Sequence, residues 1–273
     1  MTPEPQVAPE VLAFYTDTID ESTRLTSSAD GLLELVRTKE ILHRHLPPSP
    51  ATVLDVGGGP GIHARWLIQD GYTVHVVDPV PRHVNQAVKT GATAELGDAR
   101  KLTALDNSYD VVLLMGPLYH LLERQDRDRA LAEALRTVKP GGLVAAAAIG
   151  RYASLFEHVA TTLLDIDRVR DAVTDILGTG VHEPGRKGFT AAYFHTAQGL
   201  AEELTAAGVR GVEVFGIEGP AWAVLKGAEQ HSGESVRDTA MFRAALEAAR
   251  LAEPYPDLLA ASSHMLAVGM APE

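Results

Sequence analysis

Short apolar runs alternate with segments of helical spacing after residue 50. The runs predict strands over 52–56, 72–77, 93–95, 109–114 and 143–148. Apolar positions three or four residues apart follow most of the runs and predict the helices between the strands. Because the strands are mostly apolar, both of their faces must be covered. This pattern is typical of a parallel sheet between two layers of helices.

The segment before the first strand predicts two further helices. One covers residues 8–26, and the second begins after Asp30 and keeps its helical spacing to Leu46. The pair Pro47-Pro48 ends it, because proline lacks the amide donor and crowds the preceding turn. We therefore expect residues 1–48 to form a helical cover on a main domain of residues 49–273.

The second half of the chain interrupts the alternation and then resumes it. Residues 151–178 have the spacing of one amphipathic helix and precede a polar stretch, so we expect a cap insertion at about 151–190. A helix, a strand, a helix and a strand then follow and predict an antiparallel hairpin at one sheet edge; they cover 197–207, 212–217, 236–251 and 264–268. The predicted fold class is α/β, with a seven-stranded, mostly parallel, doubly wound sheet.

A glycine-rich turn joins the first predicted strand to its helix. It comprises Gly57, Gly58, Gly59 and Gly61, and Asp55 lies inside the strand before it. Glycines suit a tight turn that a ligand must approach closely. In open parallel sheets, ligands bind at the carboxyl ends of the strands where the strand order reverses, and the first strand borders that point.

Acidic residues follow the next two strands. Asp78, beside Pro79, ends the second strand about twenty residues after the glycines, where a carboxylate accepts ribose hydroxyls. Asp98, beside Ala99, follows the third strand and is placed to accept from an adenine amino group. So many carboxylates favour a cationic sulfonium cofactor over the pyrophosphate of NAD.

These motifs, taken in order, resemble those of the class I S-adenosylmethionine-dependent methyltransferases of the small-molecule type. The resemblance covers roughly residues 50–150 and includes Tyr109–Gly116 and Val138–Gly142. It implies S-adenosylmethionine as the cofactor, with Asp55, the four glycines, Asp78 and Asp98 holding it. Met115 and Gly116 would border its methionine end.

His120 is the candidate catalytic residue, since a histidine suits the removal of a proton from a hydroxyl or ammonium nucleophile. The alternative is that it braces the following helix. Arg37 is a candidate for the cofactor carboxylate, because its guanidinium is planar and forked. A salt bridge of Arg37 with Glu34 or Glu40 is equally open, and Tyr15 is a candidate wall of the cofactor site.

Candidate substrate residues come from a looser resemblance of the flanks to small actinobacterial-type methyltransferases of loosely assigned substrate. They are Tyr119, His195, Glu218 and Trp222. Packing in the core is an open alternative for the last three. No metal is expected, because His43 and His45 do not share a helix face and the other histidines are scattered.

The composition of the chain indicates which class of acceptor and which cellular compartment to expect. The 273 residues include 24 Lys and Arg against 36 Asp and Glu, a formal charge of −12. Nucleic acid and anionic membranes are therefore unexpected partners, since both require clustered positive charge. The chain has no cysteine, and its first thirty residues resemble no signal peptide, which favours the cytoplasm. We expect a small-molecule acceptor and leave the oligomeric state open.

Methyl transfer to oxygen or nitrogen is thus the predicted activity, with two alternatives. The first is a protein that binds S-adenosylmethionine but has a pericyclic or regulatory role. The second is an NAD-dependent oxidoreductase, since Gly59, Gly61 and Ala64 match the dinucleotide fingerprint. In that fingerprint the first glycine lies nearer the strand end than Gly59 does, and Asp55 is foreign to it.

Overall fold

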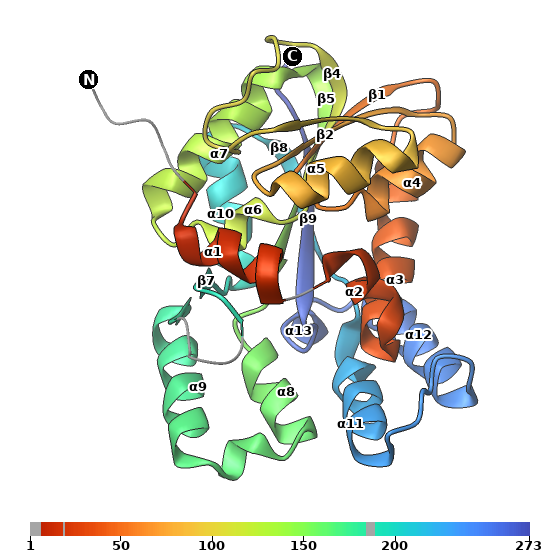
Figure 1. Cartoon of the computed structure of the whole chain (residues 1–273), viewed down its shortest axis with the longest axis vertical. Helices are drawn as coiled ribbons and strands as arrows, with labels where there is room; N and C mark the ends of the chain where they lie inside the picture. Colours follow the sequence, from red (N-terminus) through yellow and green to blue (C-terminus); the bar gives the residue numbers. More distant parts are fainter. Residues whose placement is uncertain (1–6, 19, 184–188) are drawn as a thin grey trace.

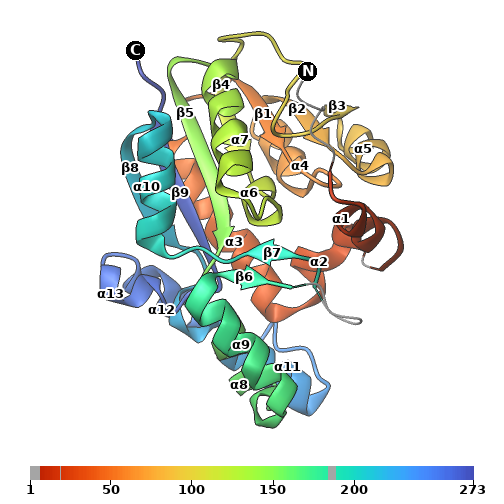
Figure 2. The same ribbon diagram turned by 90° about the vertical axis from the view of Figure 1, so that its left-hand side faces the viewer.

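A computed structural model describes residues 7–18, 20–183 and 189–273. Within these residues, seven strands form one sheet in the order β3-β2-β1-β4-β5-β9-β8, and β6 pairs with β7 in a small second sheet (Figures 1 and 2). In chain order the strands are β1 Thr52–Val56, β2 Thr73–Asp78, β3 Thr93–Leu96, β4 Tyr109–Leu114, β5 Val138–Ile149, β6 Val181–His182, β7 Ala192–Tyr193, β8 Arg210–Gly216 and β9 His264–Met270.

Five neighbouring strands are parallel to one another: β3, β2, β1, β4 and β5. The strand β9 is antiparallel to both of its neighbours, β5 and β8. This arrangement confirms the predicted seven-stranded, mostly parallel sheet. The expected antiparallel pair is also present, with β9 lying between β5 and the edge strand β8. The central strands are apolar because helices cover both of their faces; Leu54 and Val112 are fully buried.

Two hydrophobic cores lie on opposite faces of the sheet. On one face, α7 (Arg124–Thr137) and α10 (Ala197–Ala207) contribute Leu131 and Leu200. On the other face, α3, α4 and α5 pack against the strands through residues such as Leu42 and Leu67. These three helices are Ala29–His45, Ile62–Gln69 and Pro81–Ala87.

The remaining helices gather near the carboxyl ends of the parallel strands, at the lower end of the sheet in Figure 1. α1 and α2 lie across this end, and the helix pairs α8 with α9 and α11 with α12 project beyond it. These elements are α1 Pro9–Ala13, α2 Glu21–Ser27, α6 Pro117–His120, α8 Ala153–Ala160, α9 Asp167–Thr179, α11 Trp222–Ser232, α12 Ala240–Ala252 and α13 Pro256–Leu259.

Two predicted helices are wrong as single elements. The segment 8–26 consists of α1, a π-helical turn at Phe14–Thr18 and α2, which starts afresh because Asp20 accepts a hydrogen bond from the Ser22 amide. The segment 151–178 is divided into α8, a 3₁₀ turn at Leu163–Asp165 and α9, since Thr162 has a φ of 59°. Such a left-handed residue ends a helix. Part of the expected cap, residues 184–188, lies outside the described residues.

The late helices also differ from expectation. α11 follows β8 after a 3₁₀ turn at Gly219–Ala221, where no helix is predicted, and Gly233 caps its end with a φ of 70°. α12 begins at Ala240 rather than at residue 236, because Thr239 caps it by accepting from the Phe242 amide.

No described helix has both the length and the apolar character needed to cross a membrane.

Candidate functional site

A cavity of about 380 Å³ opens at the carboxyl ends of the parallel strands. One side is formed by the glycine turn and by the residues that follow β2, β3 and β4. The other side is formed by α2, α3, the end of β5 and the first residue of β9. This is the edge of the sheet where ligands bind in open α/β folds.

The glycine turn holds the backbone against the next strands. The Gly57 amide donates to the Val77 carbonyl at 2.7 Å, and Gly57 has a φ of 70°. A Cβ on Gly57 would lie 2.8 Å from Cδ of Pro117, and one on Gly58 would lie 2.5 Å from Oδ2 of Asp55. Neither position accepts a side chain, so the close packing of the turn requires glycine at both.

Asp78 ties the end of β2 to this turn. Its Oδ2 accepts from the Gly59 amide at 2.9 Å, and its Oδ1 accepts from the Val80 amide at 2.9 Å and lies 3.0 Å from Nδ1 of His83. A carboxylate has about four acceptor positions. One position therefore remains for a ligand, on a side chain that lines the cavity and is 4% exposed.

Asp98 also lines the cavity but is ion-paired. Arg100 donates to both of its carboxylate oxygens, at 2.9 and 2.6 Å, and donates to Asp126 as well. The neighbouring Pro79 and Ala99 line the same wall.

Met115 and Gly116 line the cavity at the end of β4, and α6 then brings in Tyr119 and His120. The Tyr15 hydroxyl lies 2.9 Å from Nε2 of His120. Burial raises the pKa of Tyr15 and lowers the pKa of His120 to about 4. His120 is therefore neutral near pH 7, and its Nε2 shares a hydrogen bond with the Tyr15 hydroxyl.

Several predicted site residues lie elsewhere. Arg37 is 1% exposed and forms ion pairs with Glu40 and Glu253, so the predicted contact with the cofactor carboxylate is wrong and one of the alternative salt bridges is present. Asp55 lies beneath the turn, outside the cavity lining. Its carboxylate oxygens are buried without a hydrogen-bond partner in the described part of the chain. Burial, followed by the charge of Asp78, raises the pKa of Asp55 to about 7.

Three of the four predicted substrate residues also do not line the cavity. His195 is buried, with Nε2 3.4 Å from Glu203. Trp222 belongs to a core cluster, and its Nε1 donates to the Ala261 carbonyl at 2.9 Å. Glu218 is 2% exposed and lies behind His264. Tyr119 alone of the four is at the cavity.

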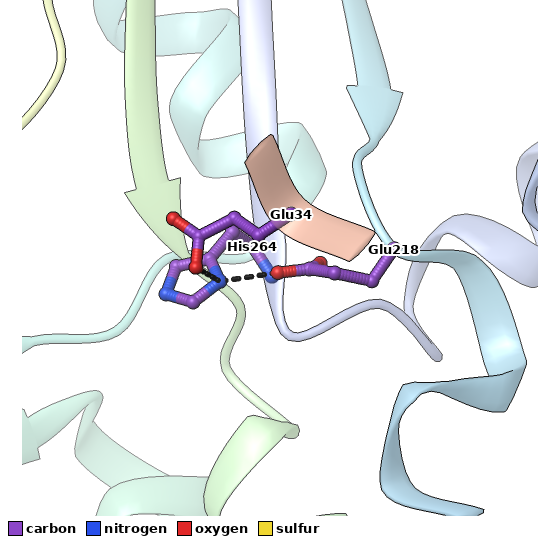
Figure 3. A group of neighbouring side chains, drawn as sticks. All are labelled: Glu34, Glu218 and His264. Carbon is purple, nitrogen blue, oxygen red and sulfur yellow. Dashed lines mark hydrogen bonds and ion pairs between the residues drawn. The ribbon is translucent and has the colours of Figure 1, made fainter. Parts of the chain in front are cut away.

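Most of one charged group that lines the cavity was missed in the sequence. Glu34 receives two hydrogen bonds from Arg24, at 2.8 and 3.0 Å, and its carboxylate lies 3.6 Å from Nδ1 of His264. Nδ1 of His264 also lies 2.5 Å from Oε1 of Glu218 (Figure 3). Of this group, the sequence singles out Glu218 alone, through the looser resemblance of the flanks. Arg24, Glu34 and His264 are far apart in the chain, and no local signal identifies their roles. His63 and His83 are further missed lining residues.

Burial would lower the pKa of His264, but the carboxylates of Glu34 and Glu218 raise it to about 9. Burial would likewise raise the pKa of Glu34, but Arg24 and His264 lower it to about 2. Near pH 7 the group therefore consists of two carboxylates held by an imidazolium and a guanidinium.

Residues 53–142 match the protein family described as "Methyltransferase domain". An uncharacterized methyltransferase of Mycobacterium tuberculosis is 35% identical over 99 residues, which is 36% of this chain and 39% of that protein. Methyltransferase GfsG of Streptomyces halstedii is 31% identical over 150 residues, 51% of this chain and 52% of that protein. The chain thus spans about half or less of these relatives' lengths.

Among solved structures, phosphoethanolamine N-methyltransferase 2 of Haemonchus contortus superposes with a TM-score of 0.59 at 17% identity. The match covers 99% of this chain and 61% of that one. At this identity the likeness shows the fold alone. Together, the strand order and the matched domain show a class I methyltransferase fold, whose residues 53–142 match the methyltransferase domain family.

Proposed function

We propose that the protein transfers a methyl group from S-adenosylmethionine to an oxygen or nitrogen atom of a small metabolite. The observation that carries the proposal is one cavity lined by two unlike sets of residues. The glycine turn, Asp78 and Asp98 line it with groups suited to the cofactor, and Arg24, Glu34 and His264 line it with a separate charged group. Methyl transfer requires both ligands in one enclosed space, because the nucleophile, the methyl carbon and the sulfur must be collinear.

The residues present fit the cofactor. Nε2 of His83 is buried and lines the cavity, and it has no hydrogen-bond partner among the described residues. Buried polar atoms are rarely left unpaired, so this atom favours a ligand hydroxyl beside Asp78. When bound, the cofactor supplies an electrophilic methyl group on a sulfonium. We assign its contacts to the glycine turn and to Asp78, Pro79, Asp98, Ala99, Met115, Gly116 and Tyr15.

The helices at the open end act, in this proposal, as a cover. Glu21, Arg24 and Leu25 on α2 and Glu34 on α3 line the cavity, so closing these helices over bound ligands would exclude water. The cap insertion that follows β5 contributes less directly to the cavity. No described residue between 148 and 216 lines the cavity, and the insertion meets the site where Phe189 packs against His120, with ring centroids 5.8 Å apart.

A small acceptor is favoured by size and charge. Ligand sites range over roughly 300–1,000 Å³, and a cavity of about 380 Å³ that also holds the cofactor leaves room for little more than one small molecule. The formal charge of −12 opposes an anionic polymer. A cytoplasmic setting, suggested by the cysteine-free sequence, is part of the same proposal. His120 remains a candidate for proton transfer or for positioning the acceptor.

The test is a calorimetric titration of the purified protein with S-adenosylhomocysteine beside a titration with NAD. We expect S-adenosylhomocysteine alone to bind, followed by loss of the methyl group from S-adenosylmethionine when small acceptors are supplied. Binding of NAD alone would overturn the proposal. Binding of S-adenosylmethionine without methyl consumption by any acceptor would point to a non-methylating role.

A further inference from the structure

His264 lines the cavity at the edge where the parallel strands end. It is the first residue of β9 and pairs with Ile149 at the end of β5. Because β9 is antiparallel to its neighbours, its start lies at the edge where the parallel strands end. Adjacent strands lie about 4.8 Å apart, so β9, two strands from β4, is about 10 Å from the strand end that carries Met115 and Gly116. That span fits one small molecule.

Glu218 fixes the orientation of the His264 ring. Its carboxylate accepts from the Ser262 hydroxyl at 2.7 Å, from the His264 amide at 2.9 Å and from Nδ1 of His264. With three donors and 2% exposure, this carboxylate cannot swing away. Nδ1 therefore carries a hydrogen, and Nε2 is the ring atom left to exchange a proton.

Nε2 of His264 faces away from both carboxylates (Figure 3). No hydrogen bond from the described residues reaches it, and His264 lines the cavity. In this respect it differs from His120, whose Nε2 is engaged by Tyr15.

The same group also has the composition of a metal site. Among the described residues, Glu34, Glu218 and His264 offer ligand atoms that all lie within 4.8 Å of one another. However, Nδ1, the atom that would bind the metal, already donates to Glu218, and Arg24 holds both oxygens of Glu34. A metal would have to displace a proton and a guanidinium, so the cluster is better explained as a device that orients His264.

Apolar and aromatic side chains also line the cavity, including Leu25, Tyr119, Ala147 and Ile217. Such walls suit the flat, apolar body of an acceptor. The polar group that this body presents to Nε2 must exchange a proton with a histidine.

We infer that His264, oriented by Glu218, is the catalytic base for an acceptor that carries an acidic hydroxyl on an aromatic or enolic body. This inference rests on the proposed function. In the neutral form of His264, which becomes frequent only as the pH approaches 9, Nε2 takes the proton of the acceptor O–H, and the acceptor oxygen bonds to the methyl carbon. The bond from that carbon to the sulfonium sulfur breaks and leaves its electron pair on sulfur. The imidazolium then releases the proton to solvent.

The pKa of His264 supports an acceptor with a phenolic or enolic hydroxyl. The charged groups facing His264 are Glu34 on α3, Glu218 after β8 and Arg24 on α2, and together they set its pKa at about 9. A phenol has a pKa of about 10, so a proton moves between the two at little cost. Aliphatic alcohols are far less acidic and would not be deprotonated.

The first arm of the test is nuclear magnetic resonance of the histidine-labelled protein. We expect one ring to titrate near pH 9, to vanish in His264→Gln and to titrate at lower pH in Glu218→Gln. The matched control is His231→Gln, an exposed histidine on α11. Adding phenol with S-adenosylhomocysteine should shift the His264 signal. Titration of His264 below pH 7 would overturn the inference.

The second arm measures methyl transfer to phenols of increasing size beside matched cyclohexanols. We expect phenols alone to react, with a turnover that rises with pH toward about 9. His264→Gln should lower kcat by about 100-fold or more, with unchanged binding of S-adenosylhomocysteine. Glu218→Gln should move the pH profile of turnover to lower pH. This second variant tests the inference if His264→Gln does not fold.

The two proposals fail in different ways. A wild-type protein that does not bind S-adenosylhomocysteine refutes the proposed function itself. A protein that binds it but methylates no phenol, or whose His264→Gln variant keeps full kcat and the same pH profile, refutes only the assignment of His264 and its acceptor class.

Discussion

Asp78 has two tasks in the structure, which makes it the most informative single residue of the cofactor wall. It holds the amides of Gly59 and Val80, and it lines the cavity with one acceptor position free. A carboxylate in this position acts both on the shape of the turn and on the ligand. Its removal should therefore affect binding more than the loss of one contact would.

Asp78→Ala is expected to weaken the binding of S-adenosylhomocysteine at least tenfold. A hydrogen bond to a charged group contributes about 1.5–3 kcal/mol, and the turn also loosens. Calorimetric titration measures the effect. Asp128→Ala, an exposed acid on α7, is the matched control. Unchanged affinity in Asp78→Ala would refute the assigned ribose contact.

Asp55 makes stability depend on pH without touching the cavity. Its pKa is about 7 in the folded state, against 3.8 in the unfolded chain. Between these values the folded state keeps a proton that the unfolded state has lost, so this group lowers the free energy of unfolding as pH rises from about 4 to about 7. Above pH 7, Asp55 is charged in both states, and the loss in the free energy of unfolding is complete.

Asp55→Asn removes this titration. We expect the stability of the variant relative to wild type to increase between pH 4.5 and pH 8, measured by denaturant unfolding without ligand. The comparison is between the two pH values, so a constant packing defect in the variant does not affect it. A difference between variant and wild type that is the same at both values would contradict the prediction.

At the scale of elements, a buried ion pair joins α7 to α10. Arg127 donates to both carboxylate oxygens of Glu203, and each residue is 3% exposed. Burial would raise the pKa of Glu203, but His195 and Arg127 lower it to about 2. Removing one charge from such a pair leaves the other buried and uncompensated.

Glu203→Gln should lower the free energy of unfolding by about 3 kcal/mol. Denaturant unfolding measures it, with Glu202→Gln as the control, because Glu202 is an exposed neighbour on the same helix. Equal stabilities of the two variants would show that the ion pair does not hold α7 to α10.

The predicted elements were most accurate where periodicity and turn residues agree. The helix at 197–207 matches α10 residue for residue, because Thr196 caps its start and Gly208 follows its end with a φ of 112°. The predicted helix over 151–178 was wrong although its apolar spacing is regular. Val159, Leu163 and Ile166 in that segment are exposed, so the spacing reflected no single buried face.

At the scale of the whole molecule, the cover should respond to ligand. Ala8, Val11 and Tyr15 line the cavity from the segment of α1 and the π-helical turn. S-adenosylhomocysteine bound below them would add contacts that the free protein lacks, and local opening of the segment should become rarer.

Hydrogen exchange is therefore expected to slow in residues 7–18 when S-adenosylhomocysteine is added. α12, none of whose residues line the cavity, serves as the internal reference. Equal protection with and without ligand in the first segment would contradict its role as a cover. NAD should leave both segments unchanged.

The sequence by itself determined the sheet, the glycine turn and the acids after β2 and β3. These features depend on local periodicity, on backbone conformations open only to glycine, and on positions counted from strand ends. The tertiary structure alone decided which distant charges meet. Arg37 has the right chemistry for a cofactor carboxylate, yet it is held by Glu253 from the far end of the chain. Glu34, Glu218 and His264 are far apart in the sequence and become a group only because α3, the end of β8 and the start of β9 converge at one edge of the sheet.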